Sequence, residues 1–209
     1  MKSKRTLSFT LVVALLAALV LAAGVALWLG PDSRSAGSRE GDGDVLIGGP
    51  FTLVDQDGRT VTEKNWPGQY LLVYFGYTYC PDVCPTDLQR NAQAMVALEA
   101  SKPAAAARVQ PVFITVDPER DTVAVMKAYV TAFHPRLVGL TGSQAQVDAA
   151  KRAYRVYSAK AQQGETAADY LVDHSALTYL MTPDGKYAAH FSSTVTPEEV
   201  AARLGDLVR

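Results

Sequence analysis

Apolar and polar residues divide the chain into stretches of different character. Residues 7–30 carry no charged side chain and consist mostly of Leu, Val, Ala and Gly. Residues 31–44 are rich in Gly, Ser and charged residues without apolar periodicity, which is typical of a tether. From residue 45 onward, short apolar runs alternate with segments of helical spacing. We therefore expect a cytoplasmic N-terminus at 1–6, a transmembrane anchor at 7–30, a flexible tether at 31–44 and a folded domain at 45–209.

The apolar stretch is long enough to cross a bilayer. About 24 residues of helix, at about 1.5 Å per residue, span a hydrocarbon core of about 30 Å. Lys2, Lys4 and Arg5 precede the stretch, so the positive-inside rule leaves the N-terminus in the cytoplasm. A cleaved signal peptide is the alternative, because Gly24 and Ala26 offer small residues at a plausible cleavage spacing. Both interpretations place the folded domain on the extracytoplasmic (periplasmic) side of the cell membrane.

The folded region alternates strand and helix patterns. The run 70–77 (YLLVYFGY) is continuously apolar and aromatic, as expected for a strand buried on both faces of a sheet. Residues 109–116 (VQPVFITV) have the same character. Turn sequences predict two hairpins, 51–54 with 59–61 and 176–181 with 187–191. The remaining expected elements are helices at 88–100 and 123–133, a strand at 137–140, a helix capped by Ser143 and a final helix opened by Thr196-Pro197.

This element order predicts the fold class. Strands that alternate with helices build a parallel sheet core, and a closing hairpin followed by a helix adds antiparallel strands. The order βαβ, a crossover, then ββα is the thioredoxin arrangement. We therefore expect a thioredoxin-like α/β domain with a central mixed sheet flanked by helices. An N-terminal β-hairpin precedes the main sheet, and the transmembrane helix precedes the domain.

Charge and cysteine content narrow the function. The net charge is -1, and no Lys/Arg cluster follows the apolar stretch, so nothing predicts a nucleic-acid partner. The chain has two cysteines, Cys80 and Cys84. In an exported domain such a pair is a structural disulfide, a redox couple or a metal site. A disulfide that closes so short a loop removes little chain entropy, which disfavours the structural role.

The position of the cysteines favours reactive sulfurs. They lie in YTYCPDVCPTDL, between the strand 70–77 and the following helix. Open α/β sheets place their sites at such strand ends. Cys84 falls near the helix N-terminus, where we expect the helix dipole to lower the thiol pKa and favour the thiolate. The spacing itself permits both a disulfide and a shared metal ion.

His174 is the candidate third ligand. It precedes the 176–181 strand, in a loop that a thioredoxin-like topology packs against the cysteines. Two thiolates and an imidazole suit Cu(I), also hold Cu(II), and with a water accept Zn(II). We favour copper because the site is exported and potentially redox-active. Asp173 either orients the imidazole or guards the entry of a cation, or it is simply a turn residue. His134 and His190 have no predicted role.

Asp117 and Asp121 form a further acidic pair. They lie in DPERD, after the strand 109–116 and before a helix, so helix capping is one explanation. The segment ends a central strand at the same edge as the cysteines. The alternative is therefore a docking role, in which the two aspartates present negative charge to a copper donor or a partner protein.

Three motifs together resemble the Sco/SenC family. They are YFGYTYCPDVCPTDL, FITVDPERDT and VDHS, in this order. The resemblance as a whole runs from about residue 51 to the C-terminus. The resemblance implies an anchored, exported, thioredoxin-like protein whose Cys80, Cys84 and His174 bind copper, with Asp117 and Asp121 in the family's aspartate loop. It also implies a role in assembling the CuA site in subunit II of cytochrome c oxidase. Thioredoxins differ, because they use CxxC and a cis-proline where this chain has Asp173-His174-Ser175.

The sequence leaves three functions open. The first is a copper metallochaperone that works with cytochrome c oxidase subunit II and other exported copper chaperones. The second is an exported thiol-disulfide reductase that keeps the CuA cysteines reduced, with Cys80 and Cys84 as the redox-active pair and thioredoxin-like reductants as partners. The third is a copper-responsive sensor. A reductase does not need His174, whereas a copper site does.

Overall fold

The structure, a computed structural model, describes residues 47–162 and 170–209. The expected transmembrane anchor, the tether and the start of the domain at residue 45 lie outside these residues. Within the described ranges, no helix combines the length and apolar character needed to cross a membrane.

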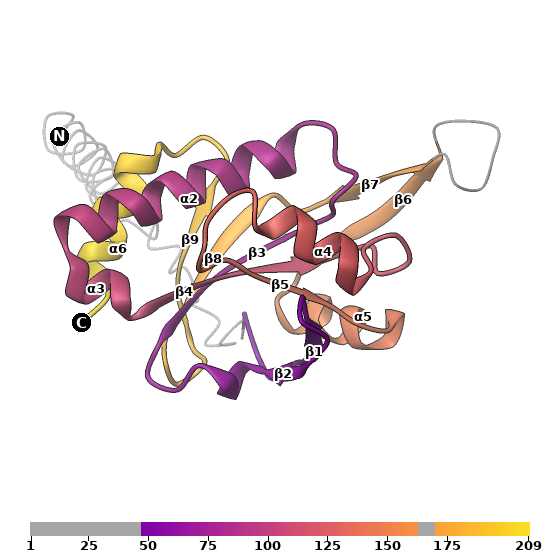
Figure 1. The fold of residues 1–209 in the computed structure, drawn as a ribbon, viewed down its shortest axis with the longest axis horizontal. Helices are drawn as coiled ribbons and strands as arrows, with labels where there is room; N and C mark the ends of the chain where they lie inside the picture. The colour runs from indigo at the N-terminus through magenta and orange to yellow at the C-terminus, as the bar shows by residue number, and fades with distance from the viewer. Residues whose placement is uncertain (1–46, 163–169) are drawn as a thin grey trace, which may run out of the picture. The chain divides into compact units, whose positions relative to one another are not determined.

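A seven-stranded mixed sheet forms the centre of the fold (Figure 1). Its strand order is β2-β1-β5-β4-β3-β8-β9, and β3, β4 and β5 are parallel, while the outer pairs are antiparallel. The strands are β1 (Thr52–Asp55), β2 (Thr60–Thr62), β3 (Tyr70–Gly76), β4 (Val109–Thr115), β5 (Val138–Thr141), β8 (Leu177–Met181) and β9 (Tyr187–Ser192). A second sheet pairs β6 (Ser158–Gln162) with β7 (Tyr170–His174).

Helices cover both faces of the large sheet. They are the 3-10 helix η1 (Glu63–Asn65) and the α-helices α2 (Val83–Ser101), α3 (Pro103–Ala107), α4 (Val123–Val130), α5 (Gln144–Ala153) and α6 (Pro197–Leu207). Figure 1 shows α2 and α4 on one side of the sheet and α5 on the other. This arrangement confirms the predicted thioredoxin-like α/β architecture.

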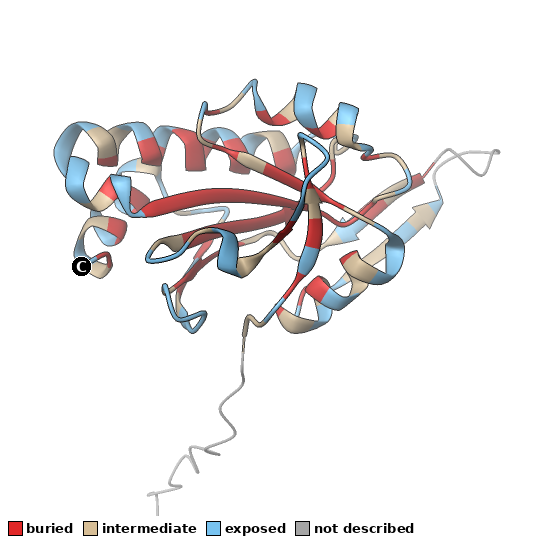
Figure 2. Cartoon of the chain, turned by 60° about the horizontal axis from the view of Figure 1, so that its bottom comes forward, coloured by how far each residue is buried: buried red, intermediate tan, exposed pale blue. Residues whose placement is uncertain are grey.

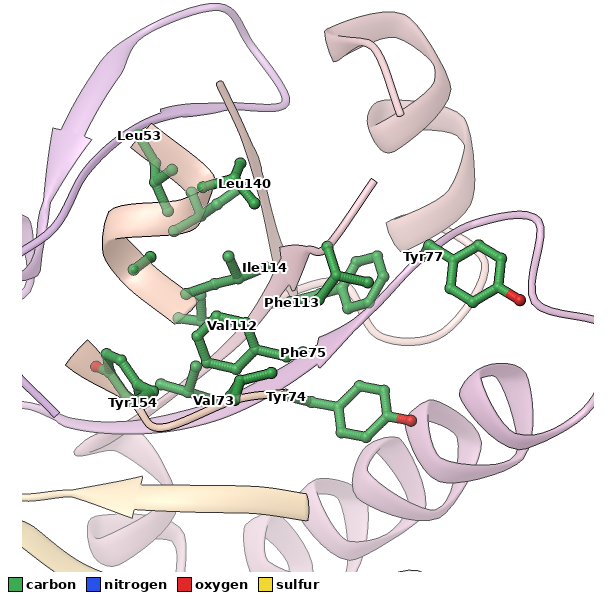
Figure 3. Packing of buried hydrophobic residues seen from close by; sticks show 14 of the residues in the cluster. Leu53, Val73, Tyr74, Phe75, Tyr77, Val112, Phe113, Ile114, Leu140 and Tyr154 are labelled. Atoms are coloured by element: carbon green, nitrogen blue, oxygen red, sulfur yellow. The ribbon is translucent and has the colours of Figure 1, made fainter. Parts of the chain in front are cut away.

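The central strands are buried on both faces. Every residue of β4 is buried, and so is every residue of β3 after Tyr70, which Figure 2 shows as continuous red ribbon. Successive side chains of a strand point to opposite faces. Leu72 accordingly packs in the cluster under α2 and α6, while Val73 and Phe75 lie on the side of Tyr154 (Figure 3). This double burial explains the continuous apolar run in the sequence.

Helix caps match the sequence signals. The Ser143 hydroxyl accepts a hydrogen bond from the Gln146 N–H, and the Gln146 side chain accepts from the Ser143 N–H. Thr196 and Glu199 form the same capping box at the start of α6. These reciprocal bonds satisfy N–H groups that the first helical turn leaves free.

Three features differ from the prediction. The β1–β2 hairpin does not stand apart, because β1 pairs with β5 and so extends the main sheet. The short helix α3 and the β6–β7 ribbon were not predicted, since Ser158–Gln162 reads SAKAQ, without the β-branched and aromatic residues typical of strands. His174 ends strand β7 instead of lying in a loop.

Candidate metal centre

Three elements bring Cys80, Cys84 and His174 together. Cys80 lies in the loop after β3, Cys84 in the first turn of α2 and His174 at the end of β7. Their potential ligand atoms, two Sγ and one imidazole nitrogen, all lie within 4.8 Å of one another. Cys84 Sγ is 3.1 Å from His174 Nε2, and the Cys84 N–H donates to Cys80 Sγ at 3.3 Å. Within the described part of the chain, this is the one such cluster of potential metal ligands.

Local sequence explains the close approach of Cys84 to the sheet. Gly76 ends β3, and a Cβ at this position would lie 2.8 Å from Cys84 Sγ and 3.1 Å from atoms of Tyr74 and Phe113. Glycine is therefore required for the sulfur to lie against the strand end. Pro85 falls in the first turn of α2, where the backbone has no intrahelical use for an N–H.

The two thiols have opposite electrostatic environments. A hydrogen bond from Cys84 lowers the pKa of the half-buried Cys80 thiol to about 3, and the side chain of His174 and backbone N–H groups of Asp82 and Cys84 act in the same direction. The same interaction with Cys80, together with burial, raises the pKa of Cys84. The expectation that Cys84 carries the thiolate is therefore wrong. The buried Cys84 sulfur lies beside Cys80, and this interaction, followed by burial, keeps its pKa high.

His174 presents Nε2 to the sulfurs. Its Nδ1 lies 3.2 Å from the Ser175 carbonyl oxygen, so an Nδ1–H donates there and leaves a lone pair on Nε2. The rings of Tyr77 and Tyr74 stand edge-on to the imidazole, with centroids 5.9 Å and 6.3 Å away. The histidine is thus oriented by one hydrogen bond and packed between aromatic rings.

Arg120 binds strand β7, which carries His174, through Tyr170. Its guanidinium lies 3.7 Å from the Tyr170 ring centroid and donates to the Tyr170 carbonyl oxygen at 2.9 Å. Arg120 Nε also donates to Asp117, and the Tyr170 hydroxyl donates to the same carboxylate at 2.9 Å. The Val172 N–H donates to the Tyr77 hydroxyl at 3.2 Å. These bonds connect β7 to the segments that follow β4 and β3.

Asp117 and Asp121 are both buried, with exposures of 1% and 0%. Asp121 accepts from the hydroxyls of Thr78 and Thr115, each at 2.6 Å, and burial raises the pKa of this carboxyl. Both carboxylates are enclosed by internal hydrogen bonds and lie below the surface. Neither caps α4, since Thr122 does so. Instead, Asp121 joins the segment before the cysteines to the end of β4.

The remaining candidates lie away from the three ligand atoms. Asp173 is exposed, and strand alternation directs it to the opposite side of β7 from His174, so it does not orient the imidazole. His134 is buried and its Nδ1 accepts from the Arg136 N–H. His190 lies exposed on β9, hydrogen-bonded to the Tyr187 hydroxyl.

Sequence reasoning missed the residues that surround the ligands. They are Tyr74, Tyr77, Arg120 and Tyr170. The signal for Tyr74 and Tyr77 was their place in the apolar and aromatic run 70–77, which leads directly to the cysteines. Arg120 lies between two acidic residues in DPERD, a pattern that also suits an exposed turn.

The donor set fits a soft metal ion. Two sulfurs and one imidazole suit copper in either oxidation state, and thiolate ligands select Cu(I) over harder cations. Zn(II) shares these ligands but completes a tetrahedral site with a fourth. Cys80 is partly exposed, so the site is open to exchange with solvent or a partner.

Known proteins have sequences similar to this chain. The SCO1/SenC family model matches residues 39–209. Protein SenC of Rhodobacter capsulatus is 42% identical over 205 residues, which cover 97% of this chain and 90% of SenC. The mitochondrial SCO2 homolog of Bos taurus is 47% identical over 152 residues, 73% of this chain and 56% of that protein. The chain thus spans about half the length of the mitochondrial relatives it matches.

Solved structures support the same assignment. ScoI of Arabidopsis thaliana, solved with copper bound, superimposes with a TM-score of 0.72 at 42% identity, over 78% of this chain and 98% of that one. BsSco, described as a member of the Sco family of cytochrome c oxidase assembly proteins with a disulfide switch, matches with a TM-score of 0.55 at 26% identity, over 78% of this chain and 93% of that one. The resemblance drawn from three sequence motifs is confirmed: the chain belongs to the SCO1/SenC family.

Proposed function

We propose that this protein is a copper metallochaperone that binds copper through Cys80, Cys84 and His174. In this role it assists assembly of the CuA site in subunit II of cytochrome c oxidase. The observation that carries the proposal is the convergence of two sulfurs and an imidazole nitrogen within 4.8 Å from three separate elements. Family membership supports it, because ScoI of Arabidopsis thaliana was solved with copper bound and BsSco belongs to a family of oxidase assembly proteins.

The proposal includes a location and partners. The apolar stretch at 7–30 anchors the protein as a single span, and the domain from residue 45 lies on the extracytoplasmic side of the cell membrane. Copper then arrives from another exported chaperone and leaves to subunit II. Asp173, exposed beside His174, is the candidate aspartate for contact with such a partner, while Asp117 and Asp121 support the site from inside.

A thiol-disulfide reductase is the second candidate function, and one observation favours it. Cys80 is partly exposed with a lowered pKa, while Cys84 is buried with a raised pKa. This asymmetry suits an attacking thiolate and a protonated resolving thiol. Oxidation of the pair joins Cys80 Sγ to Cys84 Sγ, while the target disulfide gains two electrons from the pair, one proton from the Cys84 thiol and one proton from solvent. The two functions use the same sulfurs and are separated by His174.

Anaerobic Cu(I) titration of the reduced full chain against a chromophoric chelator tests the proposal. We expect one tightly bound copper per chain, lost in the Cys80→Ser/Cys84→Ser variant and strongly weakened in His174→Ala. Reduction of a peptide that contains a disulfide should continue in His174→Ala at about the wild-type rate, because this reaction uses only the two cysteines. Copper binding that is indifferent to His174 would overturn the metallochaperone assignment and leave the reductase.

A further inference from the structure

A buried tyrosine hydroxyl beside Cys84 has no hydrogen-bond partner. Tyr74 is 1% exposed and lies on the opposite side of β3 from Val73 and Phe75 (Figure 3). Within the described residues its hydroxyl reaches hydrogen-bond geometry with no other group. The Tyr74 ring nonetheless lies beside the site, because a Cβ at Gly76 would be 3.1 Å from Tyr74 Cε1 and 2.8 Å from Cys84 Sγ, and the ring centroid is 6.3 Å from that of His174. The Cys84 sulfur and the Asp87 carboxylate both raise the pKa of this hydroxyl, after burial as the largest cause. Buried polar groups in folded proteins are almost always paired, so this hydroxyl requires an explanation.

Asp87 is the competing acceptor, and it is already partly satisfied. It lies one turn after Cys84 on α2, is fully buried, and accepts from Arg90 Nη1 at 2.6 Å. Its other oxygen, Oδ2, is also without a partner in the described part of the chain. The single proton of the Tyr74 hydroxyl therefore has two acceptors in reach. One of them is a carboxylate whose charge a guanidinium already balances.

Copper binding changes what surrounds Cys84. In the metal-free site the single proton of the Cys84 thiol has two acceptors, Cys80 Sγ and His174 Nε2, the second of which lies 3.1 Å from Cys84 Sγ. A sulfur that coordinates a metal has lost this proton and is an anionic ligand. A buried anion without donors is costly. The backbone N–H of Tyr77 and the Tyr74 hydroxyl both act on this sulfur as donors and lower its pKa.

We propose that the Tyr74 hydroxyl donates a hydrogen bond to the Cys84 sulfur in the copper-loaded site and thereby favours Cu(I) over Cu(II). A hydrogen bond to a ligating sulfur stabilises the state with more negative charge on that sulfur, which is the reduced one. The inference rests on the proposed copper site. It adds Tyr74 as a positioning residue that selects the oxidation state. Arg90 balances the charge of Asp87, which makes that carboxylate a weaker competitor for the proton of the Tyr74 hydroxyl.

Other tyrosines near the site fit this role less well. The Tyr129 hydroxyl is also buried without a partner among the described residues, but its interaction with the two sulfurs is through space only, with no hydrogen bond. The Tyr77 hydroxyl is held by the Val172 N–H. Tyr154 lies among Phe75 and Tyr179, so it provides a matched control for removal of a buried hydroxyl.

The test compares Tyr74→Phe with Tyr154→Phe in the full chain loaded with copper. Cu(I) and Cu(II) affinities are measured separately by chelator competition, and the sulfur-to-Cu(II) charge-transfer band is recorded. A hydrogen bond to a charged group contributes about 1.5–3 kcal/mol, so we expect the ratio of Cu(I) to Cu(II) affinity to fall about tenfold in Tyr74→Phe. For a one-electron couple this is a decrease in reduction potential of about 59 mV. The charge-transfer band should move to longer wavelength.

The controls separate this role from packing. Tyr154→Phe should leave the affinity ratio and the band unchanged. Introducing 4-aminophenylalanine at position 74 restores an N–H donor and should recover the wild-type ratio, which a packing defect would not. An unchanged ratio in Tyr74→Phe, or an equal shift in Tyr129→Phe, would overturn the inference while leaving the copper site intact. Failure of the wild-type chain to bind copper would instead overturn the proposed function.

Discussion

Cys84 Sγ lies 3.1 Å from His174 Nε2, although 90 positions separate the two residues in the sequence. The contact exists because the cysteines follow the carboxyl end of the central strand β3, and the β6–β7 ribbon brings His174 to the same end of the sheet. A ligand set assembled from such distant segments depends on the fold. Residues that hold these segments in place, such as Gly76 and Arg120, can therefore be tested by substitution in the same way as the proposed ligands.

Removal of the imidazole should affect copper far more than removal of another histidine. Changes to residues that only support metal ligands lower affinity by about 10–100-fold, so loss of a ligand in His174→Ala should lower Cu(I) affinity by more than about 100-fold. His190→Ala is the matched control, because His190 lies exposed on β9. Chelator competition measures both. Equal affinities in the two variants would exclude His174 as a ligand.

Thiol reactivity should follow the opposite pKa shifts. The pKa of Cys80 is lowered to about 3, so its thiolate is present throughout the range from about pH 5 to about pH 8, and alkylation by iodoacetamide should be nearly independent of pH. Cys84, with a raised pKa and a buried sulfur, should remain unmodified. In Cys84→Ser the strongest cause of the shift at Cys80 is altered, so its alkylation rate should regain a rise with pH. Mass spectrometry of the labelled peptides distinguishes the two sites, and preferential labelling of Cys84 would contradict the assignment.

Gly76→Ala should damage both stability and the metal site. The new Cβ would lie 2.8 Å from Cys84 Sγ, within a packed region, and overpacking of this kind costs about 1–3 kcal/mol. Gly205→Ala in α6 is the control, because the three atoms nearest its new Cβ all belong to the flexible, exposed side chain of Lys102. That change should be neutral or stabilise by roughly 0.5–1 kcal/mol. Urea unfolding gives both values, and a Gly76→Ala protein as stable as the wild type would refute the packing argument.

Arg120→Ala should release the strand that holds His174. Loss of one partner from the Arg120–Asp117 pair, in which Asp117 is buried, is expected to cost about 3 kcal/mol. Copper affinity should fall as well, because β7 loses its bond to Arg120. Lys160→Ala removes the neighbouring exposed pair with Glu119 and should cost no more than about 1 kcal/mol. Denaturation and chelator competition on both variants test this. Unchanged copper affinity in Arg120→Ala would show that the bonds between Arg120 and β7 are not needed to place His174 for copper binding.

The sequence predicted most of the main sheet because its signals are local. Strands β3 and β4 are buried on both faces, and the capping residues Ser143 and Thr196 bond within their own first turns. The β6–β7 ribbon was missed because Tyr170 and Val172 are held by long-range contacts with Arg120 and Tyr77, which no local pattern encodes.

The sequence predicted which three residues come together, but not their electrostatics. The motif identified Cys80, Cys84 and His174, because the residue types and their places at strand ends define the chemistry. The thiolate was assigned to the wrong cysteine, since the helix position of Cys84 is visible in the sequence while its burial is not. The burial of Asp117 and Asp121 was missed for the same reason, because acidic residues in a loop give no sign of being enclosed.

X-ray absorption spectroscopy of the copper-loaded full chain tests the central claim most directly. We predict two sulfur ligands and one imidazole nitrogen on each copper, with the imidazole scattering lost in His174→Ala and retained in His190→Ala. A copper ion bound by oxygen and nitrogen alone, or one whose imidazole survives in His174→Ala, would contradict the three-ligand site formed by Cys80, Cys84 and His174.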